Sequence, residues 1–190
     1  MSSDFQDTLR RLKVSRHRVQ LNPRAESDLE FIGLAGRHPE KLLYDTTVYI
    51  DILQGRFPGD GDLALRLSEA WHSPVTASEL AVTCGLLDPA HTGTPGIAGQ
   101  ISAIIDRRPS HRTIAPDPEI WRGAGILSGM LARTQGYGKE QRQRALNDAL
   151  IFETGRKYGC TVLTRNVVDF DFLQQLVPSG RVMFYKVAAR

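Results

Sequence analysis

The chain has 190 residues, of which 41% are hydrophobic and 24% charged, a composition typical of a single globular domain and not of a disordered chain. Its 24 Lys and Arg against 21 Asp and Glu leave a net charge of only +3, which is too small to indicate a nucleic-acid partner by itself. No apolar run approaches the roughly 18 residues of a membrane-spanning helix, and residues 1–13 lack the apolar stretch of a signal peptide, so we expect a cytoplasmic protein without a membrane partner.

The first 40 residues are polar and weakly periodic, and we predict one or two short helices among them. We interpret residues 1–40 as a helical extension packed on a domain formed by residues 41–190. Six basic residues and no acidic residue occur between Thr8 and Arg24, namely Arg10, Arg11, Lys13, Arg16, Arg18 and Arg24. A second basic group follows later, with Arg107, Arg108, His111 and Arg112. Such groups can bind a phosphate backbone or can simply be solvated surface.

The first half of the predicted domain begins with a short apolar strand, Lys41–Tyr44, and a turn at Asp45. A helix over residues 46–53 follows, and the Gly-rich stretch 54–62 is a predicted loop. We then predict a helix over 63–72, a strand over 74–77, and a helix over 79–87 with Ser78 as its N-cap.

The second half contains helical spacing over residues 97–106 and a predicted strand over 111–115. Asp117 and Pro118 are in the order expected where a helix begins, and this helix should run to about Thr134. A longer helix over 139–158 should end at Gly159, followed by strands over 160–164 and 181–187. Alternation of strands and helices predicts an α/β fold with a mostly parallel sheet.

Acidic and amide side chains follow three of the predicted strands. Asp45 comes directly after the first strand, Glu79 two residues after the second, and Asn166 and Asp169 after the strand that ends at Thr164. In parallel sheets the ligand site lies beyond the carboxyl ends of the strands, so these oxygen ligands should gather at one edge. The three acids have simpler interpretations: Asp45 as a helix cap, Glu79 as a favourable charge in a first helical turn, and Asp169, like Asp171, as a surface acid in a turn.

Asp148 is placed differently, within the long predicted helix and with Ala145, Ile151 and Phe152 at helical spacing around it. A carboxylate on an apolar helical face is costly to bury unless a cation or strong donors compensate it. An ion pair with Arg144 or Arg165 is one possible compensation, and a metal ion is another.

The chemistry of these ligands favours a hard divalent cation. Mg²⁺ prefers carboxylate and water oxygens, and one or two such ions neutralise the charge that makes a phosphodiester difficult to hydrolyse. Neither Cys84 nor Cys160 has a second Cys or a His at metal-ligand spacing, so the sequence does not predict a zinc site.

Four segments, in this order, resemble the motifs of PIN domains. They are Leu42–Asp51, an apolar strand followed by Asp-Thr; Ala77–Leu80; Asn147–Phe152, which contains Asp-Ala-Leu-Ile; and Gly159–Phe170, a strand leading to Thr-Arg-Asn and then Asp-Phe. One such motif would be weak, whereas four in order at compatible spacing are specific. The match runs from about Leu42 to Val187, and the length suits the VapC toxins among PIN proteins.

The resemblance implies a PIN-like three-layer α/β/α fold in which Asp45, Glu79 and Asp148 form a central acidic triad. The fourth position falls on Asn166, where many family members have Asp, or on Asp169, which could supply the missing charge. The metal ligands so implied are Asp45, Glu79, Asp148 and Asp169, with Asn166 as a further catalytic residue. Thr46 and Thr164 are expected to orient these ligands.

The resemblance also implies what the protein does. We expect a Mg²⁺- or Mn²⁺-dependent endoribonuclease toxin that cleaves RNA, forms a homodimer and is neutralised by a cognate antitoxin. The alternative is a catalytically idle PIN-fold module that binds RNA or protein. The chain departs from the family pattern in its 40-residue leader and in the extended, basic segment from Gln135 to Arg144, whose roles stay open.

Overall fold

The structure, a computed structural model, describes residues 4–33 and 39–187. Its strands are β1 (Lys41–Tyr44), β2 (Glu69–Trp71), β3 (Thr161–Thr164) and β4 (Arg181–Phe184). Its α-helices are α1 (Phe5–Arg11), α2 (Thr46–Leu53), α3 (Gly59–Leu67), α4 (Pro74–Leu86), α5 (Thr94–Asp106), α6 (Pro118–Gln135), α7 (Lys139–Tyr158) and α8 (Val167–Leu176). Two short 3₁₀ helices cover Glu26–Asp28 and Ser110–Arg112. None of these described helices is long and apolar enough to cross a membrane.

The sheet contains the four strands in the order β2-β1-β3-β4, and every neighbouring pair is parallel. Leu43 of β1 lies opposite Trp71 of β2 on one side and Val162 of β3 on the other. Single parallel bridges extend both edges: Phe31 pairs with Phe184 beyond β4, and His72 pairs with Thr113 beyond β2. Because all strands run in one direction, their carboxyl ends meet at one edge, as the sequence predicts.

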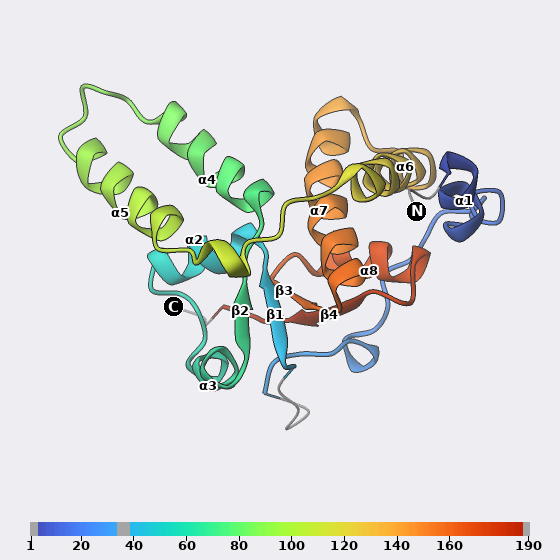
Figure 1. Cartoon of the computed structure of the whole chain (residues 1–190), viewed down its shortest axis with the longest axis horizontal. Helices are drawn as coiled ribbons and strands as arrows, with labels where there is room; N and C mark the ends of the chain where they lie inside the picture. Colours follow the sequence, from blue (N-terminus) through green and yellow to red (C-terminus); the bar gives the residue numbers. More distant parts are fainter. Residues whose placement is uncertain (1–3, 34–38, 188–190) are drawn as a thin grey trace.

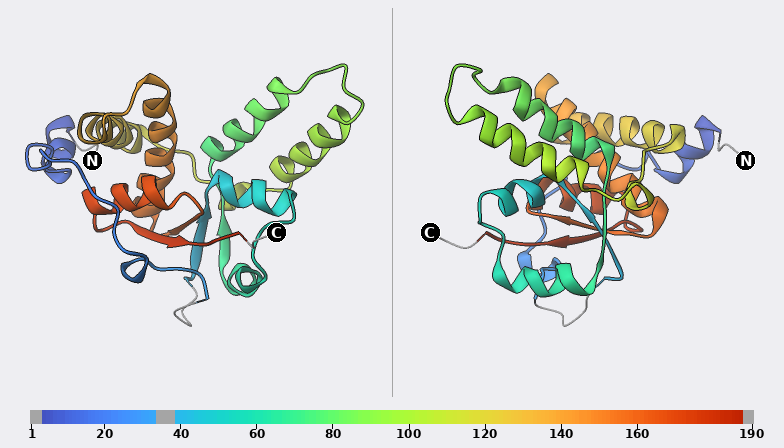
Figure 2. Two further views of the ribbon diagram at one scale, coloured as in Figure 1. Left: turned by 180° about the vertical axis from the view of Figure 1, so that it is seen from behind. Right: turned by 60° about the vertical axis from the view of Figure 1, so that its left-hand side comes forward.

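Helices cover both faces of this sheet, and side chains alternate between the two faces along each strand. Leu43, Val162 and Phe184 pack with α6, α7 and α8 in one core, whereas Leu42 and Leu163 pack with α2, α4 and α5 in the other. Figure 1 shows α6–α8 on one side of the strands and α2 on the other, with α4 and α5 extending outward as a hairpin (see also Figure 2). The predicted three-layer α/β/α architecture is confirmed.

Most predicted elements are present, but the region between α3 and α6 differs from the prediction. The predicted strand over 74–77 is wrong, because Ser73 Oγ accepts the N–H of Val75 at 3.2 Å and Pro74 takes the first turn of α4. The true strand, β2, occupies the end of the predicted helix 63–72. The predicted strand over 111–115 is reduced to the bridge at Thr113, since a 3₁₀ turn precedes it.

The helix α8 is a feature that sequence analysis missed. Sequence analysis interpreted its two aspartates, Asp169 and Asp171, as acids in a turn. In the structure Asn166 caps a helix there by accepting the N–H of Asp169. The interpretation of Asp171 as a surface acid is wrong: only 1% of this residue is exposed, and it forms an ion pair of 2.5 Å with Arg24.

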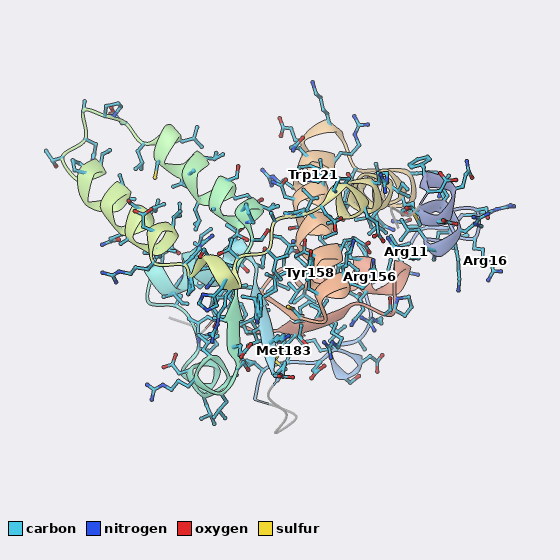
Figure 3. All side chains as sticks on the ribbon, in the orientation of Figure 1. Arg11, Arg16, Trp121, Arg156, Tyr158 and Met183 are labelled. Carbon is cyan, nitrogen blue, oxygen red and sulfur yellow. The ribbon has the colours of Figure 1, made fainter. Side chains whose placement is uncertain are left out.

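The N-terminal segment contacts the helices α6, α7 and α8 through specific ion pairs and hydrogen bonds. Arg11 donates to the fully buried carboxylate of Glu153 at 2.7 Å, and Arg156 donates to the same carboxylate at 2.9 Å. Figure 3 shows Arg11 and Arg156 approaching each other from α1 and α7. The division of the chain at residue 40 into an extension and a domain stays a prediction.

Candidate active site

Asp45 lies where β1 ends and α2 begins, and it is almost completely buried, with 3% of its surface exposed. Its Oδ2 accepts hydroxyl hydrogen bonds from Thr47 and Thr164, each at 2.7 Å, and it also caps α2 through the N–H of Thr47. Burial raises the pKa of Asp45, while the two hydroxyls act in the opposite direction. Capping and membership of an acidic site are therefore compatible roles for this residue.

Glu79 reaches the same edge of the sheet from the second turn of α4, because that helix begins five residues earlier, at Pro74, than sequence analysis expects. Its two carboxylate oxygens accept from different elements: Oε1 from the Asn147 amide at 2.9 Å, and Oε2 from the Thr46 hydroxyl. Burial raises the pKa of Glu79, and the nearby charge of Asp45 raises it further. An interpretation of Glu79 as a first-turn charge is therefore wrong.

Asp148 stands in the middle of α7, half-buried between the fully buried Ala145 and Ile151. Burial raises its pKa well above the usual range, and the carboxylates of Asp45, Asp169 and Glu79 raise it further in that order. Arg144 acts in the opposite direction without forming an ion pair with Asp148 among the described residues.

The other cation that could have neutralised Asp148 is engaged elsewhere. Arg165 donates its Nε to the buried carboxylate of Asp51 at 2.7 Å, and Arg56 donates to the same carboxylate at 2.8 Å. The hydroxyl of Tyr185 also donates to Asp51 at 2.8 Å. Asp51 is thus compensated by two arginines, whereas Asp148 is surrounded by three acids.

Asn166 and Asp169 lie at the site together, so the two candidates for the fourth position are not exclusive in space. The Asn166 amide donates to Asp148 at 3.2 Å and to Asp169 at 3.0 Å, and so connects the two carboxylates. The Asp169 Oδ1 accepts the hydroxyl of Tyr137 at 2.5 Å. The structure therefore brings Asp45, Glu79, Asp148, Asn166 and Asp169 to the carboxyl ends of β1 and β3.

Three residues that contact these side chains were not predicted, namely Thr47, Asn147 and Tyr137. Thr47 and Asn147 lie inside two of the motif segments, Leu42–Asp51 and Asn147–Phe152, which is the signal that could have identified them. Tyr137 lies between two glycines in the loop that joins α6 and α7, and no sequence pattern indicates its contact with Asp169.

The donor set fits a hard divalent cation in its chemistry, since it consists of carboxylate, hydroxyl and amide oxygens, and burial and three neighbouring carboxylates raise the pKa of Asp148. Within residues 4–33 and 39–187, no group of three or more His, Cys, Asp or Glu side chains is arranged so that it could hold a metal ion. Hydrogen bonds to Thr46, Asn147 and Tyr137 instead hold Glu79 and Asp169. Metal ligation by these residues stays a prediction.

The fold is similar to that of chains in solved toxin–antitoxin complexes. A chain of VapBC2 from Rickettsia felis, bound to a DNA fragment from the promoter, matches with a TM-score of 0.53 at 16% identity, covering 77% of this chain and 99% of that chain. A chain of VapBC-5 from Mycobacterium tuberculosis matches at 0.50 and 21% identity, covering 78% and 100%. A chain of DNA-bound VapBC from Salmonella typhimurium matches at 0.52 and 19% identity, covering 76% and 97%.

At these identities the likeness establishes the fold, and it confirms the predicted PIN-like architecture of VapC-type proteins. No family model matches the sequence, and no curated protein does so either.

Proposed function

We propose that this chain is a metal-dependent endoribonuclease toxin that cleaves RNA phosphodiester bonds and is neutralised by a cognate antitoxin. The observation that carries the proposal is the environment of Asp148. Burial and three other carboxylates raise the pKa of Asp148. Arg165 pairs with Asp51 instead, and Arg144 forms no ion pair with Asp148 among the described residues. Anions that gather in this way at a strand edge are expected where a cation completes the site.

Four carboxylates would hold a divalent cation, with Asp45 and Asp148 at the centre and Glu79 and Asp169 beside them. Mg²⁺ or Mn²⁺ would supply positive charge that offsets the negative charge of the scissile phosphate. The protein's own contribution is orientation. Thr47 and Thr164 hold the Asp45 carboxylate at 2.7 Å, and the Asn166 amide spaces Asp148 from Asp169.

The fold supports the antitoxin partner, because the matched chains come from structures of VapBC proteins, and VapBC-5 from Mycobacterium tuberculosis belongs to a family of toxin–antitoxin systems. The homodimer, the RNA substrate and the cytoplasmic location remain predictions. So does the alternative that the chain is an idle PIN-fold module binding RNA or protein, which the hydrogen bonds from Thr46, Asn147 and Tyr137 to the acids leave open.

The test is cleavage of labelled total RNA by the purified protein in Mn²⁺, in Mg²⁺ and in EDTA. We expect metal-dependent fragments from the wild type. The cleavage rate of Asp45→Asn and of Asp148→Asn should fall at least about 100-fold, because losing a group that stabilises charge in the transition state lowers rates on this scale. Asp62→Asn is the matched control, since it makes the same change at an exposed residue of α3, at the opposite end of the sheet (Figure 1).

Each outcome has a distinct meaning. Cleavage that survives in EDTA or in both site variants would point to a contaminating nuclease and would remove the support for this site. Absence of cleavage by a wild type that still binds RNA would favour the idle module.

A further inference from the structure

A shallow groove lies between α1, the loop that follows it and the end of α6. It has a volume of about 600 Å³, and its lining includes the four cations Arg10, Lys13, Arg16 and Arg133 but no acidic residue. Arg18, in the same loop, is also exposed. We call Lys13, Arg16, Arg18 and Arg133 the basic groove. Figure 3 shows Arg16 at the outer end of the molecule beside α1.

The cations of the basic groove lack carboxylate partners. Within the described part of the chain, Arg10 pairs with Asp7, but Lys13, Arg16, Arg18 and Arg133 form no ion pair. The pKa of His17 is lowered by burial and then by the positive charges of Arg133 and Lys13, which shows that like charges are crowded here. Other arginines of the N-terminal segment do pair with buried acids, as Arg11 does with Glu153.

Hydrogen bonds connect this loop to α6 and to its own backbone. Arg133 donates to the carbonyls of Val14 and His17 at 3.3 and 2.9 Å, and Arg18 donates to the carbonyl of Ser15 at 2.9 Å. Lys13 has a φ of 48°, in the left-handed region that costs a non-glycine residue about 1–2 kcal/mol. These hydrogen bonds hold the backbone of the loop in a strained conformation, and the loop presents exposed cations. We infer that the cations are positioned in advance for binding.

The basic groove is connected to the carboxylates by a short stretch of chain. Arg133 is in the last turn of α6, and Tyr137, four residues later, donates to Asp169 of the site at 2.5 Å. Four residues span at most about 14 Å even when fully extended, so the groove begins within that distance of Tyr137. Both views in Figure 2 place the N-terminal loop beside α6.

We propose that the basic groove binds the phosphate backbone of RNA whose scissile bond lies at the carboxylates, so that the substrate is held at two places. This inference rests on the proposed function and adds to it a second, sequence-independent contact. Phosphate binding requires only exposed cations, which the groove supplies. A stable protein interface has an apolar centre, and Leu9 and Val14 are the only residues with apolar side chains in the lining of this groove.

The test compares RNA affinity in variants that remove charge without touching the loop's hydrogen bonds. Lys13→Gln/Arg16→Gln changes two exposed side chains for which no hydrogen bond or ion pair holds the loop, and Arg66→Gln on α3 is the matched exposed control. Binding of a fluorescent single-stranded RNA is measured by anisotropy in EDTA, at a series of salt concentrations. Cleavage by the same proteins in Mn²⁺ is measured separately at low and saturating RNA.

We expect the double variant to weaken binding roughly 25-fold at 0.1 M salt and to reduce the salt slope by about 1.4, which is about 0.7 for each lost phosphate contact. KM should rise accordingly while kcat stays within about twofold, and the control should match the wild type.

The failures are distinguishable. An unchanged affinity and slope in the double variant, with cleavage intact, overturns the basic groove and leaves the nuclease proposal standing. Weakened binding without cleavage by any form supports the groove and contradicts the nuclease. If the wild type neither binds nor cuts RNA, both are overturned. Binding of fluorescent poly-glutamate is measured by anisotropy with the same proteins. If the double variant loses poly-glutamate binding while its RNA binding is unchanged, the surface binds an acidic protein and the RNA inference is overturned.

Discussion

At the scale of single residues, the environment of Asp148 disfavours its charged form. Its carboxylate is surrounded by Asp45, Glu79 and Asp169, and its pKa is raised well above the usual range, so the charged form is disfavoured in the folded protein. A neutral residue of the same shape removes that repulsion. The residue that the proposed site needs is therefore also one that the fold would be more stable without.

We predict that Asp148→Asn raises the melting temperature in EDTA by a few degrees, since about 1 kcal/mol corresponds to roughly 2–4 °C in a chain of this size. Millimolar Mn²⁺ should raise the melting temperature of the wild type and have little effect on the variant, because a ligand that binds only the folded state stabilises it. Differential scanning calorimetry measures both. A wild type whose melting temperature does not move with metal would show that the site as drawn is wrong.

His72 provides the second prediction at this scale, because burial, together with the positive charges of Arg108 and Arg112, lowers its pKa from 6.5 to about 4. Only 8% of this residue is exposed, and its Nδ1 lies 2.6 Å from the Tyr49 hydroxyl. Below pH 6.5, His72 binds a proton in the unfolded chain but stays neutral in the folded protein. The free energy of unfolding therefore falls as the pH decreases from 6.5 towards 4.

Between pH 7 and pH 5, the wild type should lose about 2 kcal/mol more of its free energy of unfolding than His72→Gln does. Over about 1.5 pH units of this interval, from the unfolded-state pKa down to pH 5, the unfolded chain binds one proton more than the folded protein, at about 1.4 kcal/mol per pH unit. Urea denaturation at each pH measures the difference. His91→Gln, at an exposed loop residue, is the control and should follow the wild type. Parallel pH profiles for wild type and His72→Gln would contradict the buried, neutral state of His72.

At the scale of elements, the helices α7 and α8 each contain one fully buried acid that the N-terminal segment neutralises. Glu153 of α7 accepts from Arg11, and Asp171 of α8 accepts both the backbone N–H and the side chain of Arg24, at 2.9 and 2.5 Å. The same two helices contain Asp148 and Asp169. The N-terminal segment thus stabilises the helices that position half of the candidate site.

We predict that Arg24→Gln lowers the free energy of unfolding by about 3 kcal/mol, because it leaves the Asp171 carboxylate buried without a cation. Adding Asp171→Asn should recover part of that loss, since an amide is less costly to bury than an unpaired charge. Arg10→Gln, which removes an exposed ion pair with Asp7, should leave the denaturation midpoint unchanged. Equal midpoints for Arg24→Gln and Arg10→Gln would show that the buried pair is not stabilising.

At the scale of the whole molecule, the solved neighbours are matched almost completely while part of this chain has no counterpart in them. The match to the Rickettsia felis chain covers 99% of that chain and 77% of this one, which leaves 23% unmatched (100% minus 77%). This chain's N-terminal segment also supplies Leu12 and Phe31 to the core and adds a bridge to the edge of the sheet. Within the described residues, this segment therefore packs against the core and the edge of the sheet.

Deletion of residues 2–24 should therefore destabilise the protein by more than Arg24→Gln does, because it removes Arg11, the buried Leu12 and Arg24 together. Thermal melting and the fraction recovered in soluble form measure the effect. Full stability of the deleted chain would mean that the extension is not needed for folding. The same reasoning explains why point substitutions, and not this deletion, test the basic groove.

The sequence by itself determined the parallel α/β framework and predicted the candidate site residues. Short apolar strands ending in Asp45 or in Thr164 and Asn166 are local patterns, and a Gly at the end of α7, with a φ of 69°, is a local requirement. Parallel connections then place the strand ends at one edge without further information. For these reasons the positions of β1, β3 and α7 agree closely with the prediction.

Only the tertiary structure decided which charges compensate one another. Arg165 pairs with Asp51 and not with Asp148, Arg24 neutralises Asp171 from 147 positions away, and Tyr137 reaches Asp169 across 32. No local pattern encodes such pairs, because each depends on the free energy of burying a charge at a place that exists only once the helices have packed. The same packing made β2 a strand where local spacing favoured a helix, since its backbone pairs with β1.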